Sequence, residues 1–520
     1  MLVLGFLSSV LLCILVGLIL KKSIVKRYYI RFSQTDCIYG SYIPFVTPQP
    51  LVNHQNKHAG VMYKEAPGPI KYPIIGSLYL MGQDKYPFQA LTKLKEEYGN
   101  VISLRLGTTD CISVSDEWLI HQVLIERGEH FDARPNFLRF HLMFGGSKQN
   151  ALAFCDYDEI QKIRKNLLAA HTFPRRNTLS YDKLDQIIFS ELDIFLEHLN
   201  QNTDIKLYLS KACSNIFNGY FCDTERKDYT DLQHNKYVDL FDKVFWEVNN
   251  GRAVDFIPEL MILMQLQMLG VKSQCRSIRK YVMDVILQNN LSSDQENLVG
   301  SLFSRVEEDK ANEDPETTLN RECALYALED ILGGHCAVSN ITIRMLRDIT
   351  DNPKVQEKLR AEIEKEVGAA RMSSYDVGNI HYLKACFHET LRTTCSAIVP
   401  HMANSNTTLG DYFVPKDTVV IINNHYTNFS ETLWTNPEEY NPDRFIDQRT
   451  GKFMKPSHFQ PFSSGRRSCI GYKIVTIVTT GIIAAIIRNK RVESDIPEIP
   501  VGFLALPTQP YFFQFSSVQQ

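Results

Sequence analysis

The chain has 520 residues, of which 44% are hydrophobic and 22% are charged, and its formal net charge is −3. This composition is ordinary for a globular protein, and the length allows a large buried core. The near-neutral charge speaks against nucleic acid as a partner. Neither an internal repeat nor a low-complexity tract occurs, so solenoids and disordered chains are also excluded.

The N-terminus predicts a membrane anchor. Residues 1–20 contain no charged side chain and are mostly Leu, Val, Ile and Phe, which matches the ~20 residues that cross a bilayer. Lys21, Lys22, Lys26 and Arg27 follow at once, and this favours a cytosolic location for the rest of the chain. A cleaved secretory signal is the alternative, but it needs a basic start and a small-residue cleavage site, and neither is evident.

The cysteines agree with the cytosolic side of a membrane. There are 12 of them, scattered from Cys13 to Cys469, with no Cys-x-x-Cys pair and no His-Glu-x-x-His helix. A zinc site and a redox dithiol are therefore not indicated. We expect the cysteines to be reduced, with only Cys469 taking part in chemistry.

One large domain is predicted behind the anchor. Residues 21–65 are a basic flank and linker without a clear pattern. The next segment, Ala66–Pro73, holds three prolines and predicts a stiff, extended backbone. No further linker follows, so residues 66–520 are predicted to form a single catalytic domain.

The segments of this domain predict a mainly α protein with a minor β portion. Phe88 to Tyr98 has the period of an amphipathic helix, and Val101 to Leu106 alternates as a strand. Long helical patterns occupy most of residues 115–395. Short strands and turns return at residues 407–424 and near the C-terminus.

A helix predicted over residues 323–351 carries two adjacent glycines, Gly333 and Gly334, in its middle. Each glycine costs about 1 kcal/mol relative to alanine inside a helix, so a compensating reason is expected. Close approach of a ligand is one explanation, and a helix–helix contact through the glycines is the other. His335 and Ser339, four residues apart, are expected on one face of this helix.

Glu389 and Arg392 are predicted to share a helix face, because they are three residues apart. A second arginine, Arg444, can close a Glu-Arg-Arg cluster. An exposed ion pair of this kind would contribute little, so the cluster matters only if it is buried.

The segment around Cys469 predicts a site for a metal cofactor. Gly465 provides a turn that a side chain would obstruct, and Gly471 leaves room for a flat ligand against the backbone. The apolar run Tyr472 to Ile487 predicts a buried helix that begins close to the sulfur. Its N-terminal dipole, with Arg466 and Arg467, is expected to favour the thiolate that iron needs.

Residues 462–471 match the haem-ligand signature Phe-x-x-Gly-x-Arg-x-Cys-x-Gly at every fixed position, so the chain resembles the cytochrome P450 family. Glu389-Thr-Leu-Arg392 resembles the Glu-x-x-Arg pair of that family, and Tyr440 to Phe445 resembles its Pro-x-Arg-Phe segment. The resemblance implies a cytochrome P450 fold behind the N-terminal anchor. It also implies that the Glu-Arg-Arg cluster is structural rather than catalytic.

The resemblance implies haem b (iron protoporphyrin IX) as the cofactor, with Cys469 as the metal ligand. Basic residues of the family hold the haem propionates, since buried carboxylates need paired charges. One position departs from the family, because the helix of Arg164 has Ile160 where a tryptophan is usual. The expected cofactor-binding residues are Phe462, Gly465, Arg467, Gly471, His401 and Arg164.

The predicted catalytic groove departs further from the family pattern. The usual helix carries Ala/Gly-Gly-x-Asp/Glu-Thr, but the acid position is Cys336 and the alcohol position is Ala337. Neither side chain delivers protons to bound oxygen well. The expected catalytic positions are Gly333, Gly334, His335, Ala337 and Ser339.

Three outcomes remain open for this groove. His335 and Ser339 can organise a water that delivers protons. Alternatively, bound dioxygen reacts before its O–O bond is cleaved. In the third outcome, the enzyme rearranges or dehydrates an oxygenated substrate without electrons from a reductase.

The Gly-Gly-His helix and the Cys469 segment are similar to insect Spook-type members of the family, which act early in ecdysteroid (moulting hormone) synthesis. This resemblance implies a sterol substrate and a monooxygenase on the cytosolic side of the endoplasmic reticulum membrane. NADPH-cytochrome reductase is the implied partner and supplies electrons from NADPH. A catalytically silent protein that binds haem or sterol is the alternative from another class.

Overall fold

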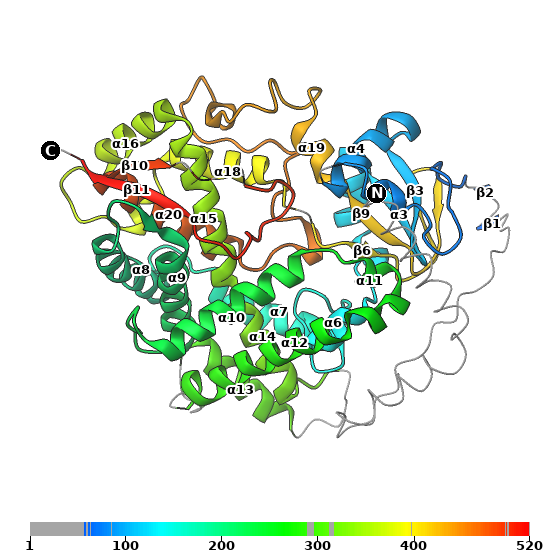
Figure 1. Cartoon of the computed structure of the whole chain (residues 1–520), viewed down its shortest axis with the longest axis horizontal. Helices are drawn as coiled ribbons and strands as arrows, with labels where there is room; N and C mark the ends of the chain where they lie inside the picture. The colour runs from blue at the N-terminus through cyan, green and yellow to red at the C-terminus, as the bar shows by residue number, and fades with distance from the viewer. Residues whose placement is uncertain are drawn as a thin grey trace, which may run out of the picture.

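The computed structural model describes residues 57–58, 61–62, 64–84, 86–288, 296–310, 317–396, 398–494, 496 and 499–518. A large helical part and a smaller part built around a β-sheet lie side by side (Figure 1). The predicted anchor, residues 1–20, lies outside the described residues. The mainly α architecture with a minor β portion is confirmed.

Long helices build the larger part, and their lengths suit the apolar periodicities of the sequence. They are α7 (Glu159–Thr172), α8 (Leu179–Glu197), α9 (Ile205–Cys222), α10 (Leu232–Asn249), α12 (Met261–Tyr281), α13 (Leu298–Asp309), α14 (Arg321–Leu332), α15 (Gly334–Thr350), α16 (Pro353–Val367), α18 (His381–Thr394) and α20 (Tyr472–Asn489). The short helices are α3 (Leu78–Met81), α5 (Glu117–His121), α6 (Leu138–Met143), α11 (Ala253–Phe256), α17 (Ser374–Val377) and α19 (Asn424–Phe429).

The smaller part is organised by a four-stranded sheet in the order β3 (Val101–Leu106), β4 (Thr109–Val114), β9 (Val419–Ile422) and β6 (His401–Met402). β4 pairs with β9 in parallel, from Cys111 opposite Val419 to Val114 opposite Ile422. This pairing joins segments about 300 residues apart. The pairing of β6 with β9 then places His401 at the sheet edge that faces the helical part (Figure 1). Figure 1 shows α4 (Pro87–Tyr98) beside this sheet.

The local predictions at residues 88–106 are confirmed. α4 begins with Pro87 at its first position, where the missing amide hydrogen has no cost, and it buries Ala90, Leu91 and Leu94. Gly99 follows with φ +91°, a conformation that favours glycine, and β3 then begins at Val101.

Three smaller sheets complete the β portion. β10 (Lys490–Ser494), β11 (Phe512–Ser517) and β5 (Thr203–Asp204) form one. Two hairpins form the others: β1 (Lys57–His58) with β2 (Val61–Met62), and β7 (Thr407–Leu409) with β8 (Tyr412–Val414).

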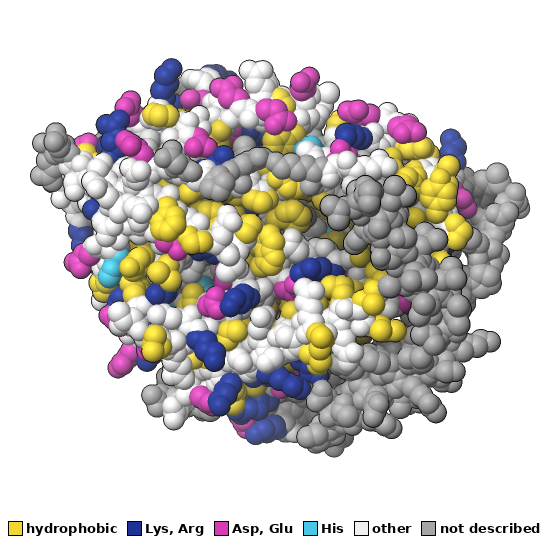
Figure 2. All heavy atoms as spheres, in the orientation of Figure 1, with side chains coloured by type: hydrophobic (Ala, Val, Ile, Leu, Met, Phe, Trp, Pro, Cys, Tyr) yellow, Lys and Arg dark blue, Asp and Glu magenta, His cyan; other side chains and the backbone are white. Residues whose placement is uncertain are grey.

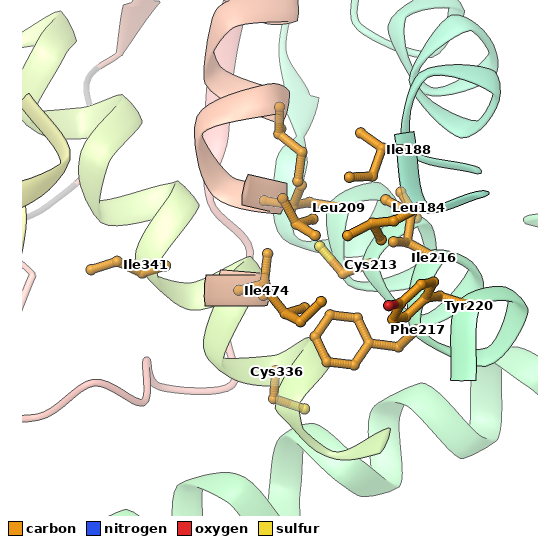
Figure 3. Packing of buried hydrophobic residues seen from close by; sticks show 14 of the residues in the cluster. Leu184, Ile188, Leu209, Cys213, Ile216, Phe217, Tyr220, Cys336, Ile341 and Ile474 are labelled. Carbon is orange, nitrogen blue, oxygen red and sulfur yellow. The ribbon is translucent and has the colours of Figure 1, made fainter. Parts of the chain in front are cut away.

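The core of the helical part lies where α8, α9, α15 and α20 meet. Figure 3 shows Cys213 and Phe217 of α9 packed beside Ile474 of α20, with Cys336 on the α15 side. Among the described residues, α20 is the one helix long and apolar enough to cross a bilayer. It is mostly buried against α15 and α16, so it is a core helix of the domain.

Candidate active site

Cys469 lies in a loop that ends at the N-terminus of α20. Its backbone amide donates a hydrogen bond to the carbonyl of Phe462, with an N to O distance of 2.9 Å, and this bond closes the loop. The amides of Gly471 and Tyr472 donate to the Cys469 sulfur. The predicted position of the sulfur at a helix start is therefore confirmed.

The electrostatics of this sulfur differ from the sequence-based expectation. Burial raises the pKa of the Cys469 thiol, and the amides of Gly471 and Tyr472 with Lys165 lower it by less. Arg466 instead pairs with Asp132, at 3.1 Å between nitrogen and oxygen. The side chain of Cys469 is exposed by surface area, although enough protein surrounds it for desolvation to be the largest influence on its pKa. A bound metal ion would itself deprotonate such a thiol.

Gly465 is required by the backbone of this loop. Its φ is +69°, and a Cβ atom there would overlap the carbonyl oxygen of Leu124. Gly471 has a negative φ and ordinary space around it, with Val475 4.0 Å from an ideal Cβ. Phe462 packs against the ring of Tyr472, with 5.9 Å between centroids.

Gly465→Ala is expected to lower the free energy of unfolding by more than about 2 kcal/mol, because it adds left-handed strain to a backbone clash. Urea unfolding measured by circular dichroism checks this result. Gly82→Ala is the control, since φ is −103° there and nothing lies within 4 Å of an ideal Cβ. Equal stability of the two variants would contradict the role of Gly465.

A cluster of basic side chains, Arg134, Arg467 and His401, lies beside this loop. Arg467 donates through Nη2 to the carbonyls of Ala153 and Cys155, at 3.0 and 2.8 Å. Arg134 donates through Nε to the same Ala153 carbonyl, at 3.1 Å, so the two guanidinium groups are neighbours. His401 on β6 contacts the Phe131 carbonyl through Nδ1, at 2.7 Å.

In this basic cluster Arg134 and His401 are buried and Arg467 is half-buried. Neither Arg134 nor Arg467 forms an ion pair with a carboxylate of the described residues. Within the same part of the chain, Arg467 Nη1 and His401 Nε2 are buried and have no hydrogen-bond partner. Burial, with the two neighbouring arginines, holds the pKa of His401 well below its usual range. A buried guanidinium donor such as Arg467 Nη1 requires an acceptor.

Arg134 is a site residue that the sequence reasoning missed. It precedes Pro135 in a segment with no distinguishing motif, and only the fold brings it to Arg467 and His401. An arginine in a short polar segment gives no local signal that it will be 4% exposed.

Arg164, one of the predicted residues, is oriented differently. It is buried on α7 and donates to the carbonyls of Gln149 and Asn150, at 3.0 and 2.9 Å. Its side chain is thus directed to the turn at residues 148–150, although its charge still acts on Cys155 beside Arg467.

The predicted glycine helix is divided at Gly333 into α14 and α15. An ideal Cβ at Gly333 would lie 2.9 Å from Phe241 of α10, and one at Gly334 would lie 2.9 Å from Phe217 of α9. The contact between helices, one of the two explanations for these glycines, is therefore present. Both glycines are nevertheless only partly buried.

His335 and Ser339 share a buried face of α15. His335 Nδ1 contacts the carbonyl of Leu332 at 2.7 Å, and its ring packs edge-on against Phe241. The Ser339 hydroxyl donates to the Cys336 carbonyl, at 3.2 Å. Because Gly333 and Ala337 lie on another side of the helix, this geometry gives no support to a water held by His335 and Ser339.

The Glu-Arg-Arg cluster is formed, with Glu389 and Arg392 buried and Arg444 at its edge. Arg392 holds both oxygens of Glu389, at 2.8 and 2.9 Å, and Arg444 donates to the same carboxylate at 2.9 Å. Glu389 and Arg392 are both 0% exposed. The remaining guanidinium hydrogens go to backbone carbonyls, including Asn428 and Thr435. The cluster thus ties α18 to the segment before α20.

Comparison with known proteins agrees with this fold and site. The family model for Cytochrome P450 matches residues 66–515. Cytochrome P450 307a1 of Drosophila melanogaster is 33% identical over 494 residues, which cover 87% of this chain and 89% of that protein. Cytochrome P450 1A1 of Pleuronectes platessa is 27% identical over 447 residues, covering 82% and 85%. Steroid 17-alpha-hydroxylase/17,20 lyase of Peromyscus leucopus is 25% identical over 441 residues, with the same coverage.

These matches define a haem-dependent monooxygenase. The chain belongs to the cytochrome P450 family. Membership implies a haem iron cofactor, and the resemblance to the insect Spook-type members is confirmed.

Proposed function

We propose that the protein is a membrane-bound haem-thiolate monooxygenase that oxidises a sterol early in ecdysteroid synthesis, with electrons from NADPH-cytochrome reductase. Similarity to Cytochrome P450 307a1 and to a steroid hydroxylase supports a sterol or steroid substrate. The two segments that resemble Spook-type members support the place in ecdysteroid synthesis.

One observation carries the haem site: two arginines that form no ion pair with a described carboxylate, and a buried histidine, lie next to the loop of Cys469. Haem has two carboxylates, and the Arg467 Nη1 donor has no partner among the described residues; His401 Nε2, also without one, would donate once its ring is protonated. Arg134 adds a second guanidinium group next to Arg467. These residues therefore fit a flat cofactor with two negative charges, whose carboxylates would be bound by side chains next to the Cys469 loop.

Each residue then has a distinct task. Cys469 would hold the iron, while Phe462 and Gly471 would lie against the ring, and Gly465 fixes the loop. When bound, thiolate-ligated haem supplies the chemistry that inserts oxygen into a C–H bond. Gly333 and Ala337 would lie on the opposite side of the ring, where neither contributes a bulky side chain of its own.

Arg134→Met is expected to lower haem affinity about tenfold or more, because charge-assisted hydrogen bonds contribute about 1.5–3 kcal/mol each. The ratio of haem absorbance to protein, after extensive dialysis, measures retention. Arg449→Leu is the control, since Arg449 is 91% exposed. Equal haem retention in both variants would remove Arg134 from the cofactor site.

The surface supports a substrate that arrives from a membrane. Four apolar side chains with 42% to 85% exposure line one part of α12: Ile262, Leu263, Leu266 and Leu269. Figure 2 shows hydrophobic side chains gathered across the middle of the face that carries α10 and α12. The predicted anchor would hold such a surface near the endoplasmic reticulum membrane.

A second candidate function is a rearrangement or dehydration without reductase, which the thiol and methyl group at Cys336 and Ala337 favour. Incubation with reductase, NADPH, labelled dioxygen and a panel of sterols separates the candidates. Labelled oxygen in the product supports the monooxygenase. Product without NADPH consumption supports the second candidate, and sterol binding without product supports a non-catalytic protein.

A further inference from the structure

Two side chains of α15 are bonded to the C-terminal loop, which we define as residues 500–507. The side-chain oxygen of Asn340 accepts a hydrogen bond from the backbone amide of Leu506, at 3.0 Å. One turn later, Arg344 donates to the carbonyl of Pro500, at 2.8 Å. Both side chains are buried, so water does not compete for these bonds. The C-terminal loop is therefore fixed against α15 by polar contacts.

Two other helices hold the far end of the C-terminal loop. Lys206 of α9 forms a buried ion pair with Asp242 of α10, at 2.8 Å between nitrogen and oxygen. The same ammonium group donates to the carbonyl of Pro507, at 3.1 Å. Asp242 in turn accepts from the hydroxyl of Thr508, at 3.3 Å. The loop is thus bonded to α9 as well as α15, and the position of the Leu506 amide is defined from both sides.

Asn340 also contacts the turn that follows the break at Gly333. Its side-chain nitrogen donates to the carbonyl of Cys336, at 2.7 Å, and the Ser339 hydroxyl donates to the same carbonyl. The backbone is irregular here, because the Cys336 amide donates to the Gly333 carbonyl three residues back instead of four. One fully buried amide side chain therefore bridges the C-terminal loop and this irregular turn.

The bridge constrains the backbone at Cys336. Because Leu506 is buried, its amide needs the acceptor that Asn340 provides, and this requirement fixes the orientation of the Asn340 side chain. Side-chain donors that bond a helix carbonyl bend the helix locally. The position of Ala337, the next residue, therefore depends on where the C-terminal loop holds Asn340.

We propose that Asn340 is a positioning residue for the reaction, which transmits the position of the C-terminal loop to the backbone at Cys336 and Ala337. This inference rests on the proposed function, in which Gly333 and Ala337 would lie opposite Cys469. Asn340 contacts no reacting group in this role. It holds the turn in place, and a small displacement of that turn lowers the fraction of turnovers that form product.

Two substitutions separate the two bonds of Asn340. Asn340→Leu removes both of them. Asn340→Thr keeps a donor for the carbonyl four residues back, as Thr342 already donates to the Val338 carbonyl at 2.7 Å, but its shorter side chain no longer reaches the Leu506 amide. Thr342→Val is the matched control, because Thr342 is equally buried on α15 and its hydroxyl bonds to its own helix.

The first test measures amide hydrogen exchange of the full chain by mass spectrometry. In Asn340→Thr, exchange is expected to rise about tenfold both in residues 500–507 and in residues 333–337, because one buried hydrogen bond is lost and the two segments loosen together. Thr342→Val should leave both segments at the parent rate. An increase confined to residues 500–507, or no increase in either segment, overturns the link.

The second test measures sterol product per NADPH, with haem content recorded for each variant. Both Asn340 variants are expected to lose about tenfold in product per NADPH, with the electrons appearing as hydrogen peroxide, while the KM for the sterol changes less than kcat. A merely structural defect would instead lower the haem content and leave product per NADPH unchanged.

Equal product per NADPH in Asn340→Thr and Thr342→Val overturns the positioning role. A parent enzyme that makes no sterol product contradicts the proposed function instead, and the exchange test still decides whether Asn340 links the two segments.

Discussion

Replacing Cys469 with alanine is expected to abolish monooxygenase activity and the long-wavelength carbon monoxide band that marks thiolate-bound haem. Cys469 is the one exposed cysteine among the described residues, and it lies in the same loop as Arg467. The other nine are buried or half-buried thiols. No other described cysteine lies in this loop, so a substitute ligand is absent from this part of the chain.

The reduced, carbon monoxide-treated spectrum measures this effect directly. Cys275→Ala is the matched control, because Cys275 lies on α12, away from the loop, and is half-buried. The control should keep the band and the haem content of the parent. A Cys469→Ala variant with the parent spectrum would disprove the assigned ligand and with it the proposed function.

Glu389→Gln is expected to lower the free energy of unfolding by about 3–5 kcal/mol, which is the usual cost of leaving a buried charge unpaired. The substitution keeps the shape of the side chain but removes the charge that Arg392 and Arg444 share. Both arginines are largely shielded from water, so solvent cannot replace the lost partner.

Urea unfolding followed by circular dichroism tests this result, with haem content recorded in parallel. Glu438→Gln is the control, since Glu438 is exposed. A Glu389 variant as stable as this control would show that the cluster does not stabilise the domain. Because Glu389 lies in a structural cluster, activity per bound haem should change less than the yield of folded protein.

Local signals accounted for much of the fold. Residues 88–106 were predicted correctly because proline, glycine and the apolar periods define α4 and β3 without help from distant segments. The loop of Cys469 and the helix after it were also predictable, since two glycines and an apolar run are consecutive in the chain. The Glu-Arg-Arg cluster required only a three-residue spacing and one remote arginine.

The break at Gly333 could not be predicted in the same way. The apolar pattern continues through residues 323–351, and nothing local distinguishes one helix from two. The space beside the glycines is filled by Phe217 and Phe241, which come from helices about 100 residues earlier. Only tertiary packing decides which neighbours a glycine admits.

The basic cluster was only partly predicted, because tertiary packing brings its members together. Arg467 and His401 stood in recognisable segments, whereas Arg134 had no motif, and its role depends on the shared carbonyl of Ala153. The side chain of Arg164 was expected among them but follows the turn at residues 148–150. Side-chain direction depends on which carbonyls the fold leaves open.

The pairing of β11 with β5 has a consequence for biosynthesis. Phe512 and Phe513 of β11 pair with Asp204 and Thr203 of β5. β5 therefore has no partner strand until about 300 further residues have been translated. At ~5–20 residues per second, this delay lasts on the order of 15–60 seconds. During that time β5 has an unpaired edge, and chaperones that shield unpaired strands can bind this region.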